Sequence, residues 1–288
     1  MKVIEQALLE KVIIERSRTS HKGDYGRLLL LGGTYPYGGA IIMAALAAVK
    51  SGAGLVTVGT DRKNIPALHS HLPEAMAFSL QDQQLLKEQL EKAEVVLLGP
   101  GLEDDAFGED LVKQVFAGLK QNQILIVDGG ALTILARTRL SFPSSQLILT
   151  PHQKEWEKLS GITIEKQNEA TTASALISFP QGTILVEKGP DTRIWQAGQS
   201  DYYQLQVGGP YQATGGMGDT LAGMIVGFAG QFKQASLYER VAVATHLHSA
   251  IAQELAQEHY VVLPTEISHE IPKMMKKYLK IGCARTWF

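Results

Sequence analysis

A glycine-rich turn with one acidic residue is the part of the chain best suited to chemistry. It runs Thr214-Gly215-Gly216-Met217-Gly218-Asp219, and an apolar segment follows at once. Glycines let main-chain N–H groups approach a ligand closely, and the first turn of a helix offers free N–H donors, so this turn predicts an anion site, most often for phosphate. Asp219 could accept the proton of a hydroxyl that attacks a phosphoryl group. Taken by itself, it could also be an ordinary helix N-terminal acid.

Two further polar groups follow expected strands. Thr150-Pro151-His152 with Glu155 places an imidazole and a carboxylate three residues apart, so that His152 could bind substrate and Glu155 could organise Mg²⁺ through its water shell. The plainer interpretation is a proline that begins a helix and a glutamate in its favourable first turn. Lys188-Gly189-Pro190-Asp191-Thr192 could cradle a nucleotide phosphate or form a simple turn. For each motif alone, both interpretations remain open.

The chain alternates short apolar runs with helical segments along most of its length. Strands are expected at 27–31, 55–58, 75–79, 94–98, 124–127, 146–149 and 183–187, with a hairpin at 193–195 and 202–205, and helices at 40–50, 83–92, 108–119, 153–159, 167–178, 217–232, 237–257 and from about 264. Repeated strand–helix units predict a mainly parallel sheet with helices on both faces. We therefore expect one three-layer α/β/α domain over residues 1–288, with ligands bound beyond the carboxyl ends of the strands.

Composition narrows the class of protein. The chain has 288 residues, of which 45% are hydrophobic, and a net charge of -2, so nothing indicates binding to nucleic acid or to an anionic membrane. The N-terminal residues mix acidic and basic side chains, unlike a signal or transit peptide, and no apolar stretch is long enough to span a bilayer. The single cysteine, Cys283, cannot form an internal disulfide. We expect a cytoplasmic protein.

The sequence excludes a P-loop and gives little support for a dinucleotide-binding fold. The P-loop sequence G-x-x-x-x-G-K-[ST] is missing, which excludes that kind of site. The segment from Gly32 to Gly39 follows a strand and opens a helix, as in a dinucleotide-binding fold, but it lacks the G-x-G-x-x-G spacing. Redox chemistry with a nicotinamide cofactor is therefore a minor alternative.

Two pairs of closely spaced histidines do not predict a metal site. His246 and His248 stand two apart on an expected helix and point in different directions, so we interpret them as structural or surface histidines. His69 and His71 fall in an expected loop without an acidic or cysteine partner, which makes zinc binding there improbable on chemical grounds.

A longer series of motifs resembles the ADP- or ATP-dependent NAD(P)H-hydrate dehydratases, which are repair enzymes of the ribokinase-like superfamily. The series runs in order from about His21 to about His248, and the closing helices carry little of it. Its motifs are His21-Lys22-Gly23-Asp24-Tyr25-Gly26-Arg27, Gly39-Ala40, Gly52-Ala53-Gly54-Leu55-Val56, Pro73-Glu74, Gly99-Pro100-Gly101-Leu102, Thr150-Pro151-His152 with Glu155, Lys188-Gly189, and Ala213 to Asp219 with Leu221-Ala222-Gly223.

The resemblance implies a ribokinase-like fold and roles for particular residues. The substrate would be hydrated NADH or NADPH, and the phosphoryl donor ADP or ATP with Mg²⁺. The residues implied at the dinucleotide are Ala40, Gly101, His152 and Asp219, and those implied at the adenine nucleotide are Lys188, Gly189, Pro190, Asp191, Thr192, Thr214, Gly215, Gly216 and Gly218. The resemblance also implies a homo-oligomer such as a tetramer. Many relatives also carry an N-terminal epimerase domain. Because the first motif of this chain already begins at His21, we expect any epimerase to be a separate protein.

The implied chemistry agrees with the residues. The C6 hydroxyl of the hydrate is a poor leaving group, and phosphorylation turns it into a good one that the ring nitrogen can expel. The alternatives are a kinase of the same superfamily that acts on a hydroxymethylpyrimidine or thiazole alcohol, and a nucleotide sensor without turnover. Two positions depart from the family pattern: Gly130 stands where the family often has aspartate, and Lys154 where it usually has glycine. These departures leave the shape of the substrate pocket open.

Overall fold

The structure is a computed structural model that describes residues 1–279, so Cys283 lies outside the described residues. Its strands form one ten-stranded sheet in the order β1-β10-β9-β8-β7-β6-β5-β2-β3-β4. The strands are β1 Lys2–Val3, β2 Arg27–Leu31, β3 Leu55–Thr60, β4 Met76–Ser79, β5 Val95–Leu98, β6 Ile124–Val127, β7 Gln146–Leu149, β8 Ile184–Glu187, β9 Arg193–Gln196 and β10 Tyr203–Gln204. The seven strands from β2 to β8 pair in parallel, and β9 and β10 form the expected antiparallel hairpin.

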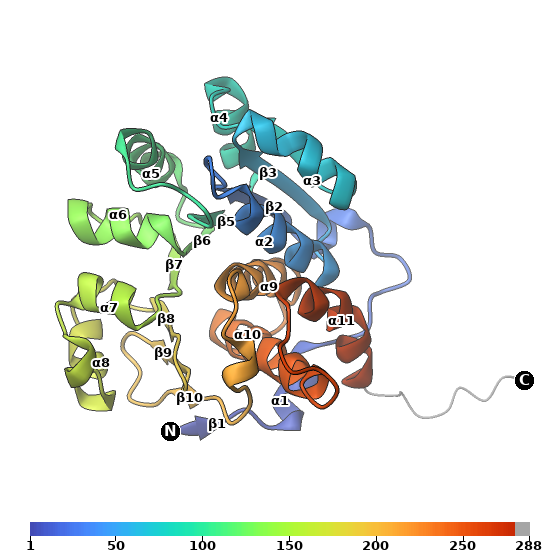
Figure 1. The fold of residues 1–288 in the computed structure, drawn as a ribbon, viewed down its shortest axis with the longest axis vertical. Coiled ribbons are helices and arrows are strands. Elements are labelled where there is room, and N and C mark those ends of the chain that lie inside the picture. The colour runs from blue at the N-terminus through green and yellow to red at the C-terminus, as the bar shows by residue number, and fades with distance from the viewer. Residues whose placement is uncertain (280–288) are drawn as a thin grey trace, which may run out of the picture.

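Helices cover both faces of this sheet, as Figure 1 shows. They are α1 Gln6–Val12, α2 Gly38–Lys50, α3 Ile65–His71, α4 Gln83–Lys92, α5 Ala106–Gly118, α6 Gly130–Thr138, α7 Gln153–Ser160, α8 Glu169–Leu176, α9 Met217–Gln231, α10 Leu237–Leu255 and α11 Pro264–Lys277. One apolar core lies between the sheet and α1, α2, α3, α9, α10 and α11, and the other between the sheet and α4 to α8. The expected three-layer α/β/α architecture is confirmed.

The central strands are short apolar runs because both of their faces are covered. All four residues of β5, and all four of β6, are buried. Strand β8 is likewise buried throughout. Continuous apolar runs of this length are typical of parallel strands between two helical layers.

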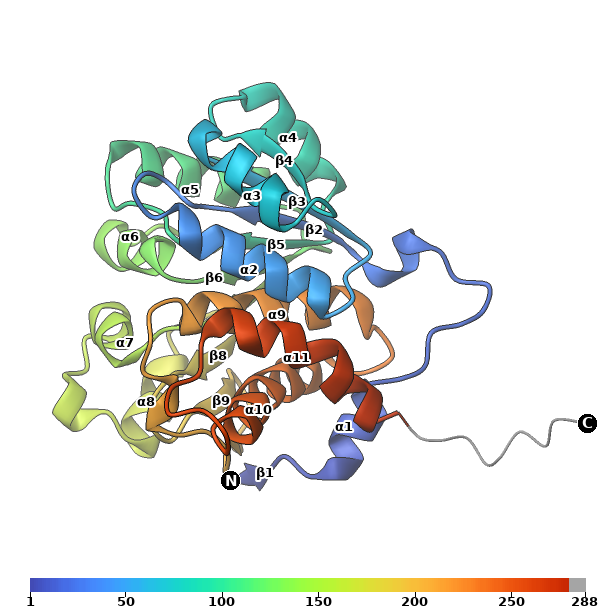
Figure 2. The same ribbon diagram turned by 45° about the vertical axis from the view of Figure 1, so that its right-hand side comes forward.

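Helix α9 is buried from Thr220 to Gln231 and packs along α2, and the two helices lie side by side in Figures 1 and 2. A Cβ added at Gly223 would lie 2.1 Å from the Ala44 carbonyl oxygen, and one at Gly227 would lie 2.7 Å from Ser51 Cβ. These contacts advance in the same direction along both helices, so the helices run parallel and their N-termini point to the same side of the molecule.

Two helices differ from the sequence prediction. His69 and His71 lie in α3 and not in a loop, because Pro66 occupies the first turn, where a missing N–H causes no loss. Helix α6 was not predicted, because Gly129 and Gly130 resemble a turn; Gly129 has a φ of 53° and supplies the N-cap. Within residues 1–279 we find no helix with the length and apolar character needed to cross a bilayer.

Candidate active site

Two loops meet beyond the carboxyl ends of the neighbouring strands β2 and β5. The chain leaves β2 towards β3 and β4 on one side and later fills β5 to β8 on the other, so the order of strands reverses between β2 and β5. Crevices at such reversals are the usual ligand sites of open parallel sheets. Gly101 has a φ of 64°, and a Cβ there would lie 3.0 Å from Ala40 Cβ. The structure therefore brings the predicted substrate residues Ala40 and Gly101 together.

The glycine turn opens helix α9, as the sequence predicts. Gly216 is the N-cap residue, with a φ of 92°, and no side chain caps this end of the helix. Asp219 stands in the first turn and is half-buried. Burial raises the pKa of Asp219 to about 6; the Asp128 carboxylate adds to this rise and Lys188 opposes it. A carboxylate with this pKa is ionised at neutral pH and can still accept a proton.

Lys188 supplies the positive charge beside Asp219. Its Nζ lies 2.9 Å from Asp128 Oδ1, and a Cβ added at Gly218 would lie 3.1 Å from the same nitrogen. Burial by itself would lower the pKa of Lys188, but Asp128, Glu155 and Asp219 outweigh burial and raise it. The ammonium therefore stays charged next to the glycine turn, where a transferring phosphoryl group would carry negative charge.

His152 begins helix α7 and forms a capping box with Glu155. His152 Nδ1 accepts hydrogen bonds of 3.1 Å from the N–H groups of Lys154 and Glu155, and Glu155 Oε2 accepts one of 2.8 Å from His152 N–H. Glu155 therefore stands in the first turn of α7, as the plainer interpretation of this motif predicts. Because Nδ1 is an acceptor, the proton of the neutral ring is on Nε2. Burial lowers the pKa of His152, with Lys188 adding to the effect.

A cavity of about 580 Å³ joins several of these groups. Its walls come from the turn after β8, the start of α9, the loop between β10 and α9, and one face of α10. Of the predicted site residues, it is lined by His152, Lys188, Gly189, Pro190, Thr192 and Gly218. The volume falls in the range of small-molecule sites, and the lining includes Met217 and Gly218 at the start of α9.

Other predicted site residues lie at the margin of this cavity or outside it. Asp191 is exposed at the tip of its turn, which Thr192 closes by donating a hydrogen bond of 2.9 Å from Oγ1 to the Gly189 carbonyl. Thr214 Oγ1 donates to the Val262 carbonyl at 3.3 Å, so its hydroxyl anchors the turn to the segment before α11. Gly215 is exposed, and a Cβ there would meet no described atom within 4 Å.

Sequence reasoning left two parts of the site without a role. It placed Asp128 at the end of a strand, on the same edge of the sheet as His152 and Lys188, but the pairing of Asp128 with Lys188 depends on the fold. His248 is 3% exposed and lines the cavity, together with Thr245 and Ser249 of α10. No spacing pattern in the sequence distinguishes His248 from the neighbouring His246.

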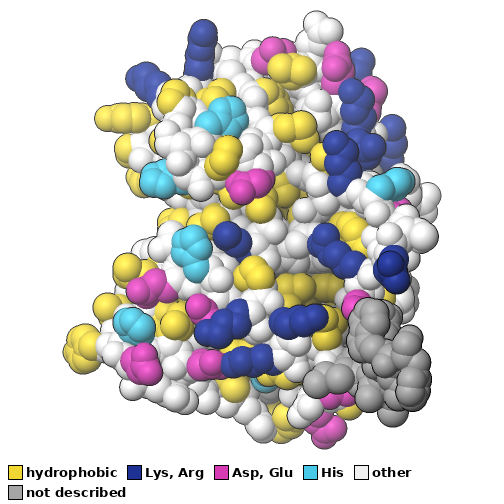
Figure 3. Space-filling model, turned by 90° about the vertical axis from the view of Figure 1, so that its right-hand side faces the viewer, with side chains coloured by type: hydrophobic (Ala, Val, Ile, Leu, Met, Phe, Trp, Pro, Cys, Tyr) yellow, Lys and Arg dark blue, Asp and Glu magenta, His cyan; other side chains and the backbone are white. Residues whose placement is uncertain are grey.

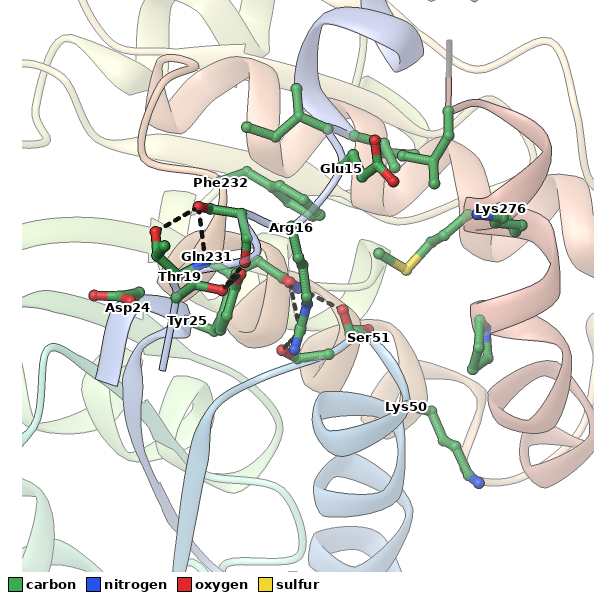
Figure 4. Close-up of a pocket in the computed structure, with 18 residues that line it drawn as sticks. Glu15, Arg16, Thr19, Asp24, Tyr25, Lys50, Ser51, Gln231, Phe232 and Lys276 are labelled. Atoms are coloured by element: carbon green, nitrogen blue, oxygen red, sulfur yellow. Dashed lines mark hydrogen bonds between the residues drawn. The ribbon is translucent and has the colours of Figure 1, made fainter. Parts of the chain in front are cut away.

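A second cavity of about 650 Å³ lies at the other ends of α2 and α9, and Figure 4 shows its lining. Arg16 crosses it and is stacked over Tyr25, with its guanidinium carbon 3.8 Å from the ring centroid. The face drawn in Figure 3 shows apolar surface between Lys and Arg side chains. This cavity contains none of the predicted site residues.

The sequence of the chain is similar to those of known NAD(P)H-hydrate dehydratases. A family model described as NAD(P)H-hydrate dehydratase matches residues 28–273. The chain belongs to this family. It is 91% identical over 276 residues, or 96% of this chain and 95% of the relative, to the ADP-dependent (S)-NAD(P)H-hydrate dehydratase of Streptococcus pneumoniae.

Two solved structures place this family member in the ribokinase-like fold. A ribokinase-like superfamily protein from Enterococcus faecalis is 43% identical, with a TM-score of 0.92, over 97% of this chain and 96% of that one. The ADP/ATP-dependent NAD(P)H-hydrate dehydratase of Bacillus subtilis, co-crystallised with ATP/Mg²⁺, is 28% identical, with a TM-score of 0.81, over 95% and 97% of the two chains.

The two departures from the family pattern have different surroundings in this dehydratase. A Cβ at Gly130 would lie 1.7 Å from the Leu102 carbonyl oxygen, so this backbone accepts only glycine there. Lys154 is exposed and pairs with Glu157 on the surface of α7. Gly130 therefore packs directly against the loop that carries Gly101. The Lys154 side chain instead forms an ion pair on the surface of its own helix.

Proposed function

We propose that the protein catalyses the ADP-dependent dehydration of (S)-NAD(P)H-hydrate to NAD(P)H. The observation that carries this proposal is the half-buried Asp219, which stands in the open first turn of α9 beside the charged Lys188. The name of the 91% identical S. pneumoniae relative supports ADP as the donor and the S epimer as the substrate. Both NADH hydrate and NADPH hydrate are proposed substrates, and ATP is the alternative donor.

The proposed reaction has two steps. Asp219 takes the proton of the C6 hydroxyl, whose oxygen attacks the terminal phosphoryl group of ADP and releases AMP. The main-chain N–H groups of Gly215, Gly216 and Gly218, with the Lys188 ammonium, stabilise the negative charge of the transferring group. The ring nitrogen then expels the phosphate from C6, loss of a proton from C5 restores the double bond, and NAD(P)H and phosphate result.

The other predicted residues hold the two ligands. Ala40 and Gly101 lie close together where the order of strands reverses, and the dinucleotide would lie against their main chain. His152 offers its Nε2–H to the dinucleotide, because Nδ1 is engaged by the start of α7. The turn from Lys188 to Thr192 and the nearby Thr214 shape the adenine nucleotide site. Asp191, at the exposed tip of the turn, would contact only the outer part of the nucleotide.

Mg²⁺ is the proposed metal. Among residues 1–279, no group of three or more His, Cys, Asp or Glu side chains could hold a metal ion, so the nucleotide phosphates would supply most of its ligands. When bound, Mg²⁺ would neutralise phosphate charge during transfer. Glu155 fits a role through water, since Oε2 already accepts from His152 N–H; burial raises the pKa of Glu155 to about 7.

For the molecule as a whole, we propose a single domain over residues 1–288, a cytoplasmic location and a homotetramer. A separate epimerase would serve an enzyme that accepts one epimer, because hydrated NAD(P)H has a stereocentre at C6. The two epimers would otherwise accumulate unequally as one is consumed.

The test mixes the purified protein with hydrated NADH, Mg²⁺ and either ADP or ATP, and follows the near-ultraviolet absorbance of the reduced nicotinamide. We expect recovery that requires a nucleotide, is faster with ADP, and falls on the order of 10²-fold or more in Asp219→Asn. Calorimetry with ADP checks that this variant still binds nucleotide. Nucleotide binding without recovery in the wild type would contradict the proposal, and a stable phosphorylated alcohol from a hydroxymethylpyrimidine or thiazole substrate would favour the kinase alternative.

A further inference from the structure

His248 is a buried polar side chain in the wall of the nucleotide cavity. It comes from the middle of α10 and is 3% exposed. Its Nε2 is buried and has no hydrogen-bond partner among the described residues. Buried polar atoms of folded proteins almost always have a partner, so an unpaired nitrogen in the wall of a cavity points to a ligand. None of the steps proposed above uses this nitrogen.

The protonation state of His248 decides what Nε2 can bind. Burial lowers the pKa of His248 to about 4; the Met217 main chain opposes this and Lys188 adds to it. The ring is therefore neutral at pH 7 and carries one N–H. We assign the ring N–H to Nδ1, because Nε2 has no hydrogen-bond partner and the Met217 main chain favours the protonated ring. Nε2 is then left with a lone pair, which accepts a hydrogen bond but cannot donate one.

This lone pair selects among the groups of a nucleotide. Phosphate oxygens are acceptors and are repelled by another acceptor, whereas the 6-amino group of adenine and the ribose hydroxyls are donors. The cavity is lined by apolar side chains, among them Met217, Leu221 and Val207, and by the polar side chains of Thr245, Ser249 and Gln212. A flat purine ring buries the apolar part of this lining, which favours the base over the more polar ribose as the group next to Nε2.

We propose that His248 Nε2 accepts a hydrogen bond from the 6-amino group of adenine and makes this site select adenine over 6-oxopurine nucleotides. The inference rests on the proposed function, because it requires an adenine nucleotide in this cavity. A 6-oxo group places an acceptor against the acceptor Nε2, so inosine and guanosine diphosphates would leave both atoms buried without a partner. A loss of about 10-fold in binding is expected for such a mismatch.

The experiment compares three diphosphates in the dehydration assay and by calorimetry: ADP, IDP, and purine riboside diphosphate, which has no substituent at position 6. In the wild type we expect ADP to have a KM about 10-fold lower than either of the others. In His248→Leu the three KM values should fall within about 3-fold of one another. The matched control is His246→Leu on the same helix, which should keep the wild-type preference because His246 does not line the cavity.

A second variant covers the possibility that His248→Leu does not fold. Glutamine offers both an acceptor and a donor, so His248→Gln should keep ADP binding and improve IDP binding, which narrows the preference. A preference for ADP that is unchanged in both variants would overturn the inference. So would an equal loss for all three diphosphates, or a loss felt by ADP and not by 2′-deoxy-ADP, which would place His248 at the ribose. Failure of the proposed function is a separate result: the wild type would show no nucleotide-dependent recovery.

Discussion

The Lys188 ammonium, which lines the proposed nucleotide cavity, forms an ion pair with the Asp128 carboxylate at an Nζ to Oδ1 distance of 2.9 Å. The same Asp128 oxygen accepts a hydrogen bond of 2.6 Å from Thr150 Oγ1, which fixes the carboxylate between β6 and β7. The pair also faces Asp219, whose pKa is raised by Asp128 and lowered by Lys188. Asp128 is therefore a positioning residue that acts on the proposed base through charge.

Replacement of Asp128 should move the pH dependence of turnover. Asp219 must be ionised to accept a proton, so kcat should fall as the pH drops below the Asp219 pKa of about 6. Asp128→Asn removes a negative charge that raises this pKa and frees Lys188 to lower it further. We expect the acidic limb of the pH profile to move to lower pH. Asp104→Asn, on the surface beside Arg137, is the control that should leave the limb in place. An unmoved limb in Asp128→Asn would show that Asp128 does not act on Asp219.

Lys188 and Asp128 should stabilise the folded protein together, so that the effects of replacing them on the free energy of unfolding are not additive. Loss of one partner removes the nearest counter-charge of a largely buried group, and the breaking of a buried pair typically costs about 3–5 kcal/mol. Lys188→Met and Asp128→Asn should therefore each lower the free energy of unfolding strongly, and the double variant should lose clearly less than the sum of the two. Urea denaturation of the four proteins measures this cycle. Additive losses would mean that the two side chains do not interact in the folded protein.

The sequence predicted most of the sheet and the position of Asp219 in the first turn of α9. Short apolar runs, four residues in β6 and three in β7, occur where both faces of a strand are covered, and the predicted bounds of both strands match the structure. Asp219 was predictable because a glycine turn and a helix start are local features. Parallel strands bring their carboxyl ends to one edge, which is why His152 and the turn at Lys188 could be expected near one another.

What the sequence could not show depends on contacts between distant segments. Asp128 and Lys188 are 60 residues apart, and nothing local to either residue specifies the other. The cavity face of α10 is set by its packing against α9, so a histidine on that face looks like any other helical histidine. Helix α6 was missed because local glycines outweighed the apolar pattern that follows them, although packing against the sheet decides in favour of the helix.

Gly130 should be intolerant of any side chain. Its φ lies outside the positive range, so an effect of substitution would come from the Leu102 carbonyl oxygen, which lies 1.7 Å from the position of an added Cβ. We expect Gly130→Ala to lower the free energy of unfolding by about 2 kcal/mol or more, as overpacking against fixed backbone does. Gly39→Ala is the matched control in α2, where an added Cβ meets no described atom within 4 Å and alanine favours the helix. Equal thermal stability of the two variants would contradict this account.

Arg16 should stabilise the fold from the C-terminal end of α9. Its Nη2 donates to the Gly52 carbonyl, just beyond α2, and to Gln231 Oε1 at 3.3 Å, at the last residue of α9, while its guanidinium stacks on Tyr25 (Figure 4). A cation near two helix C-termini and over an aromatic ring is favourable on both counts. Arg16→Ala should therefore lower the free energy of unfolding by about 1–2 kcal/mol. Arg16→Lys should recover only part of this stability, because an ammonium cannot stack on the ring and donate several hydrogen bonds as a planar guanidinium does.

The control is Arg18→Ala, at an exposed residue of the same segment, which should lower the free energy of unfolding by about 0.5 kcal/mol or less in urea denaturation. If Arg16→Ala and Arg18→Ala unfold at the same urea concentration, Arg16 does not link the ends of α2 and α9.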